Sequence, residues 1–322
     1  MKPQATVVIC TFNRYDLLTQ AITSIELQDF PEDGYELIIV DNSSELEGRE
    51  RFLDGLDITC NHRYLREPRP GLSRARNAGV SAAAGEIIAF LDDDAKAAPD
   101  WLTHIIGTFA QYERAGIAGG PVRPIWAAAR PSWLNPRLES FLSILDRGAE
   151  TRILRAEEWL AGTNVAFRRQ ALEQAGLFPE NLGRIGRVLL SNEELSVSTK
   201  IQELGYDAVY NPKIVVHHRV HAERTSQAWL RRRIFWQVIS DLVAHGAEAA
   251  GEDANPDADI HRVLDFLDHL APKNRGMIGL FIDLDDPQLF EEQTQAVGAL
   301  ARFLAGDAGD WRRILPMASY DR

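Results

Sequence analysis

The feature that most constrains this chain is an alternation between short apolar runs, rich in Val and Ile, and longer segments with helical periodicity. The apolar runs cover residues 5–11, 35–44 and 86–94, and helical patterns cover 14–28 and 99–116. Apolar runs without polar alternation are typical of strands buried on both faces, which need helices on both sides of the sheet. The alternation therefore predicts an α/β fold with a mostly parallel, doubly wound sheet.

The regularity falls after residue 126, and from about residue 226 the pattern is mostly helical. We therefore expect an α/β domain over residues 1–221 and a helical C-terminal extension over 222–322. Within the extension, residues 228–246 combine aromatic residues with a run of three arginines. Three interpretations compete for this helix: it packs on the α/β domain, lies on a membrane surface or forms a dimer contact.

The formal net charge of −12 is unevenly distributed along the 322 residues. Residues 252–310 hold thirteen Asp and Glu against four Lys and Arg, so they carry nine of the twelve excess negative charges. The first two-thirds of the chain is close to neutral, with a local basic cluster at Arg63, Arg66, Arg69, Arg74 and Arg76. A nucleic-acid-binding protein needs a broad basic face, so nucleic acid is not expected as a partner.

The cysteine content and the absence of long apolar runs bear on location. Cys10 and Cys60 are the two cysteines, which excludes a disulfide scaffold and is typical of the reducing cytoplasm. The sequence has neither an apolar run of about 18 residues nor a signal-peptide pattern at its start. We expect a cytoplasmic protein without a transmembrane segment, and leave open a peripheral association with the inner face of a membrane.

Polar side chains follow three of the predicted strands, and the carboxyl ends of strands in an open α/β sheet are where ligands bind. We therefore expect these side chains to converge on one crevice. The three polar ends are Thr11-Phe12-Asn13-Arg14, Asp41-Asn42-Ser43-Ser44 and Asp92-Asp93-Asp94.

The three consecutive aspartates suit a divalent cation. The chain has neither GxxxxGK[ST] nor a GxGxxG after a strand, so it lacks a backbone cradle for phosphates. Carboxylates repel a diphosphate, but Mg²⁺ or Mn²⁺ can bridge the two because hard cations accept both kinds of oxygen. The alternative for Asp92, Asp93 and Asp94 is a solvated turn or a helix N-cap.

Taken together, five stretches make the sequence resemble the family 2 glycosyltransferases, which are inverting enzymes of the GT-A fold that use a nucleotide-sugar donor. The resemblance covers about residues 4–220. It is carried by VVICTFNR (7–14), LIIVDNSS (37–44), PGLSRARNAGVSAAAGEIIAFLDDD (70–94), GTNVAFRRQALEQAGLFPE (162–180) and NEELSVSTKIQELGY (192–206). It implies that residues 1–221 form a GT-A catalytic domain, followed by the helical extension.

For the nucleotide, the resemblance implies contacts from the first two strand ends. Thr11, Asn13 and Arg14 correspond to the strand end that touches the nucleoside. Asp41 corresponds to the acidic residue that hydrogen-bonds the base; its alternative is a turn aspartate that caps the strand.

Further donor contacts are implied by the later stretches. Gly71 allows a close backbone approach to the nucleotide, and Arg76 is the first choice for a contact to the diphosphate or the base. Asp92, with Asp93 beside it, lies on the nucleotide-sugar side of the acidic triplet. The small residues Gly162, Thr163 and Asn164 correspond to the turn that lines the donor-sugar pocket, with a plain strand-end turn as the alternative.

For the metal, the resemblance implies Asp94 as the best direct ligand, together with Asp92, which are the two ends of the family's DxD motif. A histidine after the last strand often completes the site in this family. Strand alternation lets only one residue of the pair His217-His218 face it, and the spacing from Pro212 favours His218. His221 is a further candidate, and a purely structural histidine is the alternative.

For proton transfer, the resemblance implies an acidic pair at the start of the helix that ends in Gly-Tyr. The family usually has Glu-Asp, whereas this chain has Glu193-Glu194. Glu194 occupies the position of the general base, and Glu193 is second choice because Glu is one methylene longer than Asp. The alternative is that acidic residues merely favour a helix N-terminus.

These assignments predict a metal-dependent inverting glycosyltransferase with a UDP-, GDP- or dTDP-sugar donor. The acceptor would be a sugar, a glycolipid or a small metabolite, and a homodimer through the C-terminal helices is left open. One alternative is a sugar-phosphate nucleotidyltransferase, although the expected Gly-rich segment with a lysine is missing. The other is a non-catalytic nucleotide-sugar-binding module, against which Asp92, Asp94 and Glu194 argue.

Overall fold

The computed structural model describes residues 2–43, 48–186, 188–245 and 255–306. Ser44 and residues 307–322, which the sequence analysis placed in a strand end and in the extension, lie outside the described residues. Contacts between residues divide the chain into two units. The first unit comprises Met1–Ile125, Ser143–Gly186 and Glu193–Val220; the second comprises Trp126–Leu142, Arg187–Asn192 and His221–Arg322.

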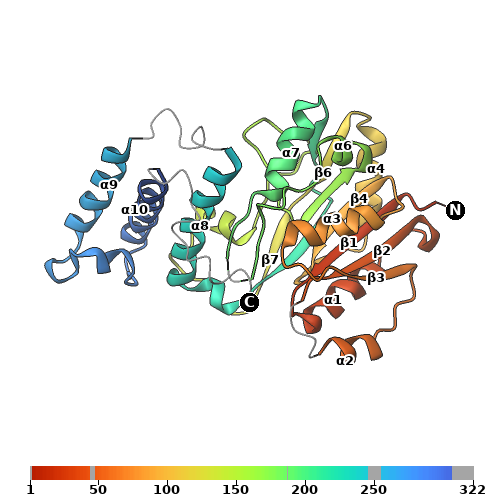
Figure 1. Cartoon of the computed structure of the whole chain (residues 1–322), viewed down its shortest axis with the longest axis horizontal. Coiled ribbons are helices and arrows are strands. Elements are labelled where there is room, and N and C mark those ends of the chain that lie inside the picture. The colour runs from red at the N-terminus through yellow and green to blue at the C-terminus, as the bar shows by residue number, and fades with distance from the viewer. Residues whose placement is uncertain (1, 44–47, 187, 246–254, 307–322) are drawn as a thin grey trace. The chain divides into compact units, whose positions relative to one another are not determined.

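Eight strands of the first unit form one sheet. Their bounds are β1 Ala5–Thr11, β2 Tyr35–Asp41, β3 His62–Arg66, β4 Ile87–Asp92, β6 Ala115–Gly119, β8 Arg152–Ile153, β9 Asn164–Arg168 and β10 Asp207–Tyr210. Their order in the sheet is β3-β2-β1-β4-β9-β6-β10-β8. Figure 1 labels the four consecutive strands β3, β2, β1 and β4. The pairs β3-β2, β2-β1, β1-β4 and β6-β10 are parallel, so the predicted mostly parallel α/β sheet is confirmed.

Two strands interrupt the parallel pattern. β9 is antiparallel to both β4 and β6, and β8 is antiparallel to β10. A small second sheet has the order β5-β11-β7, with the bounds β5 Ala95–Ala97, β11 Val216–Val220 and β7 Val122–Trp126. The segment from residue 206 to residue 220 thus contains two strands, β10 and β11, which belong to different sheets.

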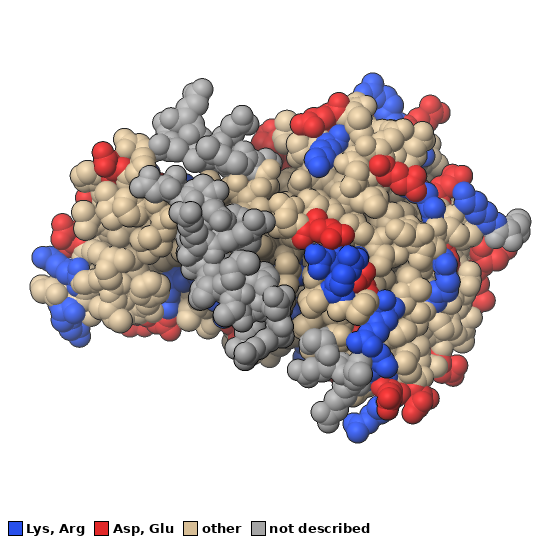
Figure 2. Space-filling model, in the orientation of Figure 1, with Lys and Arg blue, Asp and Glu red and all other residues tan. Residues whose placement is uncertain are grey.

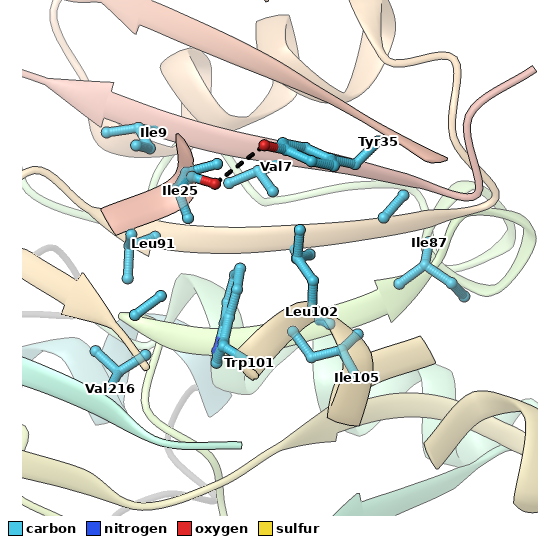
Figure 3. Close-up of a cluster of buried hydrophobic side chains, with 14 of the residues drawn as sticks. Val7, Ile9, Ile25, Tyr35, Ile87, Leu91, Trp101, Leu102, Ile105 and Val216 are labelled. Carbon is cyan, nitrogen blue, oxygen red and sulfur yellow. Dashed lines mark hydrogen bonds between the residues drawn. The ribbon is translucent and has the colours of Figure 1, made fainter. Parts of the chain in front are cut away.

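Helices cover both faces of the large sheet. Those of the first unit are α1 Tyr15–Glu26, α2 Arg49–Asp54, α3 Leu72–Ala82, α4 Trp101–Gln111, α6 Arg169–Gln174 and α7 Glu193–Glu203. On one face, Val7 and Leu91 from the strands pack with Ile25 of α1 and Trp101 of α4 (Figure 3). The Tyr35 hydroxyl donates to the carbonyl of Ile25 at 3.0 Å and so ties β2 to α1 (Figure 3).

The strand residues that alternate with Val7 and Leu91 point to the opposite face of the sheet. There Val8, Val40 and Phe90 pack with Ala75 of α3 and Val197 of α7. Successive side chains of one strand thus enter two different cores, as the uninterrupted apolar runs predicted.

The strand register places the polar strand ends next to one another. Thr11 at the end of β1 is paired with Asp41 at the end of β2, and Cys10 is paired with Asp92 at the end of β4. Because the three neighbouring strands are parallel, all three ends lie on the same edge of the sheet. The expected convergence of the three polar ends is thus a direct result of the register.

The second unit is helical. Its main helices are α5 Pro136–Glu139, α8 Gln227–His245, α9 Pro256–His269 and α10 Pro287–Gly306. α9 and α10 lie side by side (Figure 1), and Phe266, Leu280 and Ala299 belong to their shared core. Among the described helices, none combines the length and the apolar character that crossing a bilayer requires.

The arginine run of α8 does not form a solvated basic face. Arg231 and Arg233 are buried, and Arg232 between them is exposed. The Arg231 guanidinium donates to Gln293 at 3.1 Å and to Asp283 at 2.8 Å within the second unit. These contacts occupy Arg231, and Arg232 is the member of the run that stays exposed. On the face drawn in Figure 2, Lys and Arg of the described residues are interspersed with Asp and Glu.

Candidate active site

The first and third polar strand ends are joined by hydrogen bonds. The Thr11 hydroxyl donates to Asp93 Oδ2 at 2.8 Å. Arg14 Nη1 donates to Asp93 Oδ1 at 3.2 Å and to Asp94 Oδ2 at 2.8 Å. The loop after β1, in which Asn13 has a φ of 58°, therefore folds back over the aspartates. Asn is one of the few residues that adopt this left-handed conformation readily.

Asp93 points into the protein. Its side chain is buried, and Thr11 and Arg14 each contact one of its two oxygens. Burial, followed by the charge of Asp94, raises the pKa of Asp93 to about 7, and Arg14 opposes the rise. The contacts with Thr11 and Arg14 give Asp93 a supporting position within the acidic triplet, and a donor-side contact of Asp93 stays a prediction.

Asp92, Asp94 and His218 lie together as the sequence analysis expected. One potential ligand atom from each of the three falls within 4.8 Å of the others. His218 Nε2 lies 3.2 Å from Asp94 Oδ1. Alternation along β11 buries His218, whereas its neighbour His217 is half-buried.

The chemistry of this cluster fits a divalent cation. Two carboxylates offer hard oxygen ligands, and a neutral imidazole is a common further ligand. The Nδ1 atom of His218 is buried and finds no hydrogen-bond partner among the described residues. Asp92 remains partly exposed, so one ligand of the cluster is accessible from solvent.

Asp41 at the end of β2 is buried beneath two tyrosines. The hydroxyls of Tyr15 and Tyr64 both donate to Asp41 Oδ2, and the amide of Ser43 donates to Oδ1 at 2.9 Å. These contacts agree with the strand-capping arrangement that was its alternative interpretation, and a contact of Asp41 with the base stays a prediction. The Tyr15 and Tyr64 hydroxyls are the polar groups around it that sequence reasoning missed.

Asn42 is another residue that the sequence analysis did not single out. Its amide donates to the carbonyls of Glu67 and Arg69 at 2.7 and 2.8 Å, and its oxygen accepts from the amide of Gly71 at 2.8 Å. Gly71 has a φ of 142°, a conformation that favours glycine. Asn42 thus fixes the loop that leads into α3, and its position directly after Asp41 was the only sequence signal for it.

Arg76 of α3 is the centre of a buried charge cluster. Its Nη1 donates to Glu193 Oε1 at 2.7 Å, and its Nη2 donates to the carbonyl of Gly162 at 3.2 Å. Nη2 also lies 3.7 Å from Asp92 Oδ1. The structure thus directs Arg76 to the acidic pair, and the expected contact to the diphosphate or the base stays a prediction.

The acidic pair opens α7. Glu193 is buried, and burial followed by the charge of Glu194 raises its pKa to about 8, while Arg76 opposes the rise. Glu194 is half-buried, and a Cβ atom on Gly162 would lie 3.1 Å from its Oε1. The lack of a side chain at Gly162 therefore leaves room for the end of Glu194.

Thr163 and Asn164 are both buried at the start of β9. The Thr163 hydroxyl oxygen has no hydrogen-bond partner within the described parts of the chain. Asn164 accepts from Trp101 Nε1 at 2.9 Å and donates to the carbonyls of Pro121 and Ile214 at 3.0 and 2.8 Å. The side chain of Asn164 is fully buried and joins four segments, which departs from the donor-pocket contact expected for it.

We predict that Asn164→Ala lowers the free energy of unfolding by about 2–5 kcal/mol, because the buried Trp101 indole N–H and the Ile214 carbonyl lose their Asn164 partner and the Pro121 carbonyl keeps only the amide of Val216. Urea unfolding monitored by circular dichroism measures the change. Asn61→Ala, at an exposed position, is the matched control and is expected to change stability by less than about 0.5 kcal/mol. A loss below about 1 kcal/mol for Asn164→Ala would contradict the structural role.

Comparison with known families gives one match that covers about half of the chain. The family described as "Glycosyl transferase family 2" matches residues 6–176. A glucosyl-dolichyl phosphate glucuronosyltransferase of Haloferax volcanii is 29% identical over 243 residues, which are 74% of this chain and 77% of that protein. The succinoglycan biosynthesis protein ExoM of Rhizobium meliloti is 30% identical over 231 residues, 70% of each chain.

Solved structures show the same fold. A mannosyltransferase from Pyrobaculum calidifontis, in complex with GDP-Man and Mn²⁺, aligns with a TM-score of 0.61 at 23% identity, over 95% of this chain and 88% of that one. The TarS fragment 1–349 of S. aureus, in complex with UDP, aligns with a TM-score of 0.50 at 16% identity, over 95% and 92%. Both alignments extend the likeness in fold to nearly the whole chain.

Proposed function

The chain belongs to glycosyl transferase family 2 and is a glycosyltransferase; on this premise we propose that it transfers a sugar from a nucleoside-diphosphate sugar to an acceptor hydroxyl with inversion, using Glu194 as the base. One observation carries the proposal. Arg76 lies 2.7 Å from Glu193 and 3.7 Å from Asp92, so a single guanidinium joins the acidic pair to the acidic triplet. An acidic pair and a donor-binding cluster that share one guanidinium suit a direct displacement.

In the proposed reaction, the acceptor oxygen attacks the anomeric carbon as its proton passes to a carboxylate oxygen of Glu194. The new carbon–oxygen bond forms on one face of the sugar. The bond from the anomeric carbon to the diphosphate oxygen breaks on the opposite face, and its electron pair leaves with the diphosphate. Attack opposite the leaving group inverts the configuration. No covalent intermediate with the protein is needed.

The leaving diphosphate gains negative charge, which the site must stabilise. Asp92, Asp94 and His218 would hold Mg²⁺ or Mn²⁺, which supplies Lewis-acid stabilisation of that charge when bound. Arg14, whose guanidinium lies 2.8 Å from Asp94, places a positive charge of the chain itself beside the same position. The mannosyltransferase structure described with GDP-Man and Mn²⁺ supports this part of the proposal.

For the substrates, we propose a UDP-, GDP- or dTDP-sugar as donor and a sugar or glycolipid hydroxyl as acceptor. GDP-Man and UDP are bound by two of the similar structures, which supports the donor class. One relative is named for a reaction on a glucosyl-dolichyl phosphate and another for succinoglycan biosynthesis, which supports the acceptor class.

A donor panel tests the proposal. UDP-glucose, GDP-mannose and dTDP-glucose are added to the full-length protein with Mn²⁺, with Mg²⁺ or with a chelator, and both thermal stability and release of nucleoside diphosphate are measured. A nucleotide at a hundred times its Kd should stabilise the folded protein by about 2.7 kcal/mol. At least one donor is expected to raise the melting temperature and to be slowly hydrolysed only with metal. A flat response to all three donors in every condition would refute the proposal.

A further inference from the structure

Arg76 lies in an unusual position for a charged side chain. It is 3% exposed, and its guanidinium carbon lies 5.5 Å from the ring centroid of Phe90 and 5.4 Å from that of Phe178. Two aromatic rings thus flank the cation and keep solvent away from it. A buried charge of this kind needs a partner of opposite charge, because its desolvation is otherwise too costly.

The partners of Arg76 are carboxylates of the proposed site. The contact to Glu193 at 2.7 Å is a short charge-assisted hydrogen bond, and the Gly162 carbonyl accepts a second hydrogen bond from Arg76 at 3.2 Å. Asp92 lies further away, at 3.7 Å. The guanidinium is therefore directed mainly toward the acidic pair and bound on two sides.

The acidic pair itself is a conflict of like charges. Glu193 and Glu194 are adjacent at the start of α7, and Glu193 is 4% exposed. One oxygen of each, Oε2, is buried and accepts no hydrogen bond from the residues that the structure describes. Two such carboxyls compete for one proton, and a nearby cation decides how much negative charge the pair carries.

We infer that Arg76 and Glu193 are positioning residues for Glu194: Arg76 is the buried counter-ion of the acidic pair, and its hydrogen bond to Glu193 Oε1 holds the pair in place at the start of α7. This inference rests on the proposed role of Glu194. It assigns to Arg76 a task other than binding the diphosphate. Both residues act through Glu194 and need not touch the substrate.

Other charged groups near α7 leave Arg76 as the dominant cation. Asp92 of β4 also acts on Arg76 and adds negative charge, whereas burial raises the pKa of the Cys10 thiol of β1 to about 12 and keeps it neutral. Of the elements packed against α7, β10 contributes Asp207, which lies 3.7 Å from Arg114. α6 contributes Arg169, which donates to the Gly85 carbonyl at 2.9 Å, and the exposed Glu173. The β6 segment AGIAG has no charged side chain.

The test is the pH dependence of turnover in single variants, measured as hydrolysis of the most responsive donor of the panel in Mn²⁺. For Arg76→Met, loss of the cation makes the pair hold its proton to higher pH. The acidic limb of the profile should therefore shift to higher pH by about one unit. For Glu193→Gln, the pair loses one of the two carboxyls that compete for a proton, so the acidic limb should shift to lower pH by about one unit.

Two controls and one binding measurement complete the design. Two control variants are expected to leave the acidic limb at its original pH. They are Arg74→Met, two positions before Arg76 on α3, and Glu203→Gln, at the other end of α7. The Kd for UDP or GDP in Mn²⁺, measured by calorimetry, is expected to stay within about threefold in Arg76→Met, because Arg76 does not bind the diphosphate. Arg76→Lys keeps the positive charge, so its acidic limb should lie close to the pH of the limb of the unmodified protein.

The outcomes separate the possible failures. Unshifted limbs in both variants, with an inactive Glu194→Gln, would overturn this inference alone. A Kd raised more than about tenfold in Arg76→Met with an unshifted limb would also overturn it, in favour of a diphosphate contact. Full turnover of Glu194→Gln would overturn the proposed base and the inference with it. Should Arg76→Met fail to fold, the nearly isosteric Glu193→Gln decides the question by the direction of its shift.

Discussion

Glu194→Gln is expected to lower the turnover number by about a thousandfold, within the range attributed to general-base catalysis. The amide is almost the same size as the carboxylate but cannot accept the proton of the acceptor hydroxyl. Donor binding should be unchanged, because Glu194 is assigned to the acceptor side of the reaction. Steady-state kinetics at saturating donor give the turnover number, and calorimetry with UDP or GDP in Mn²⁺ gives the affinity.

Two further variants sharpen this expectation. Glu194→Asp carries the residue more usual in the family at this position, so it keeps a base that is one methylene shorter and should retain more activity than Glu194→Gln. Glu203→Gln removes a carboxylate from the exposed last turn of the same helix and should leave turnover unchanged. Equal activity of Glu194→Gln and the unmodified protein would assign proton transfer to another group, or favour a non-catalytic sugar-nucleotide-binding module.

The second large effect is expected for Asp94→Asn, which should weaken metal-dependent binding of nucleoside diphosphate by about a hundredfold, or about 2.7 kcal/mol. Asp94 is buried and lies 3.2 Å from His218 and 2.8 Å from Arg14, so it is the common member of the cation cluster and the arginine contact. An amide supplies no negative charge to a divalent ion. Calorimetric titration with UDP or GDP, with and without Mn²⁺, measures the loss.

Asp100→Asn is the matched control for this variant. Asp100 is exposed and pairs with His104 of α4 at 3.0 Å, so its change should alter neither nucleotide affinity nor its metal dependence. Proper folding of Asp94→Asn is checked by its circular dichroism spectrum. A Mn²⁺-dependent affinity in Asp94→Asn equal to that of the unmodified protein would remove Asp94 from the metal site.

The strand ends were predictable from the sequence because the information is local. The apolar runs that end in Thr11, Asp41 and Asp92 define three buried strands, and parallel pairing then places their ends on one edge. Alternation along a single strand was also sufficient to choose His218 over His217 as the buried histidine. In each case the pattern within a few residues determines the position.

The sequence predicted less well the contacts of side chains whose partners lie far away along the chain. Arg76 meets Glu193 from 117 positions away, and Asn164 meets Trp101 from 63. Their residue types suggested a diphosphate contact and a sugar contact, whereas tertiary packing turned both inward. The antiparallel insertion of β9 between β4 and β6, which a strand pattern alone does not encode, brings Gly162 and Asn164 to these partners.

The register of the three neighbouring strands also limits how this protein can be re-engineered. Thr11 pairs with Asp41, and Cys10 pairs with Asp92, without any loop between the sheet and these residues. A one-residue insertion within β1 would exchange its two faces and turn Thr11 away from Asp93. By contrast, insertions at the exposed tip near Asp54 and Gly55 lie beyond the strands and leave the pairing intact. Libraries aimed at new donors should therefore vary loops and keep strand lengths constant.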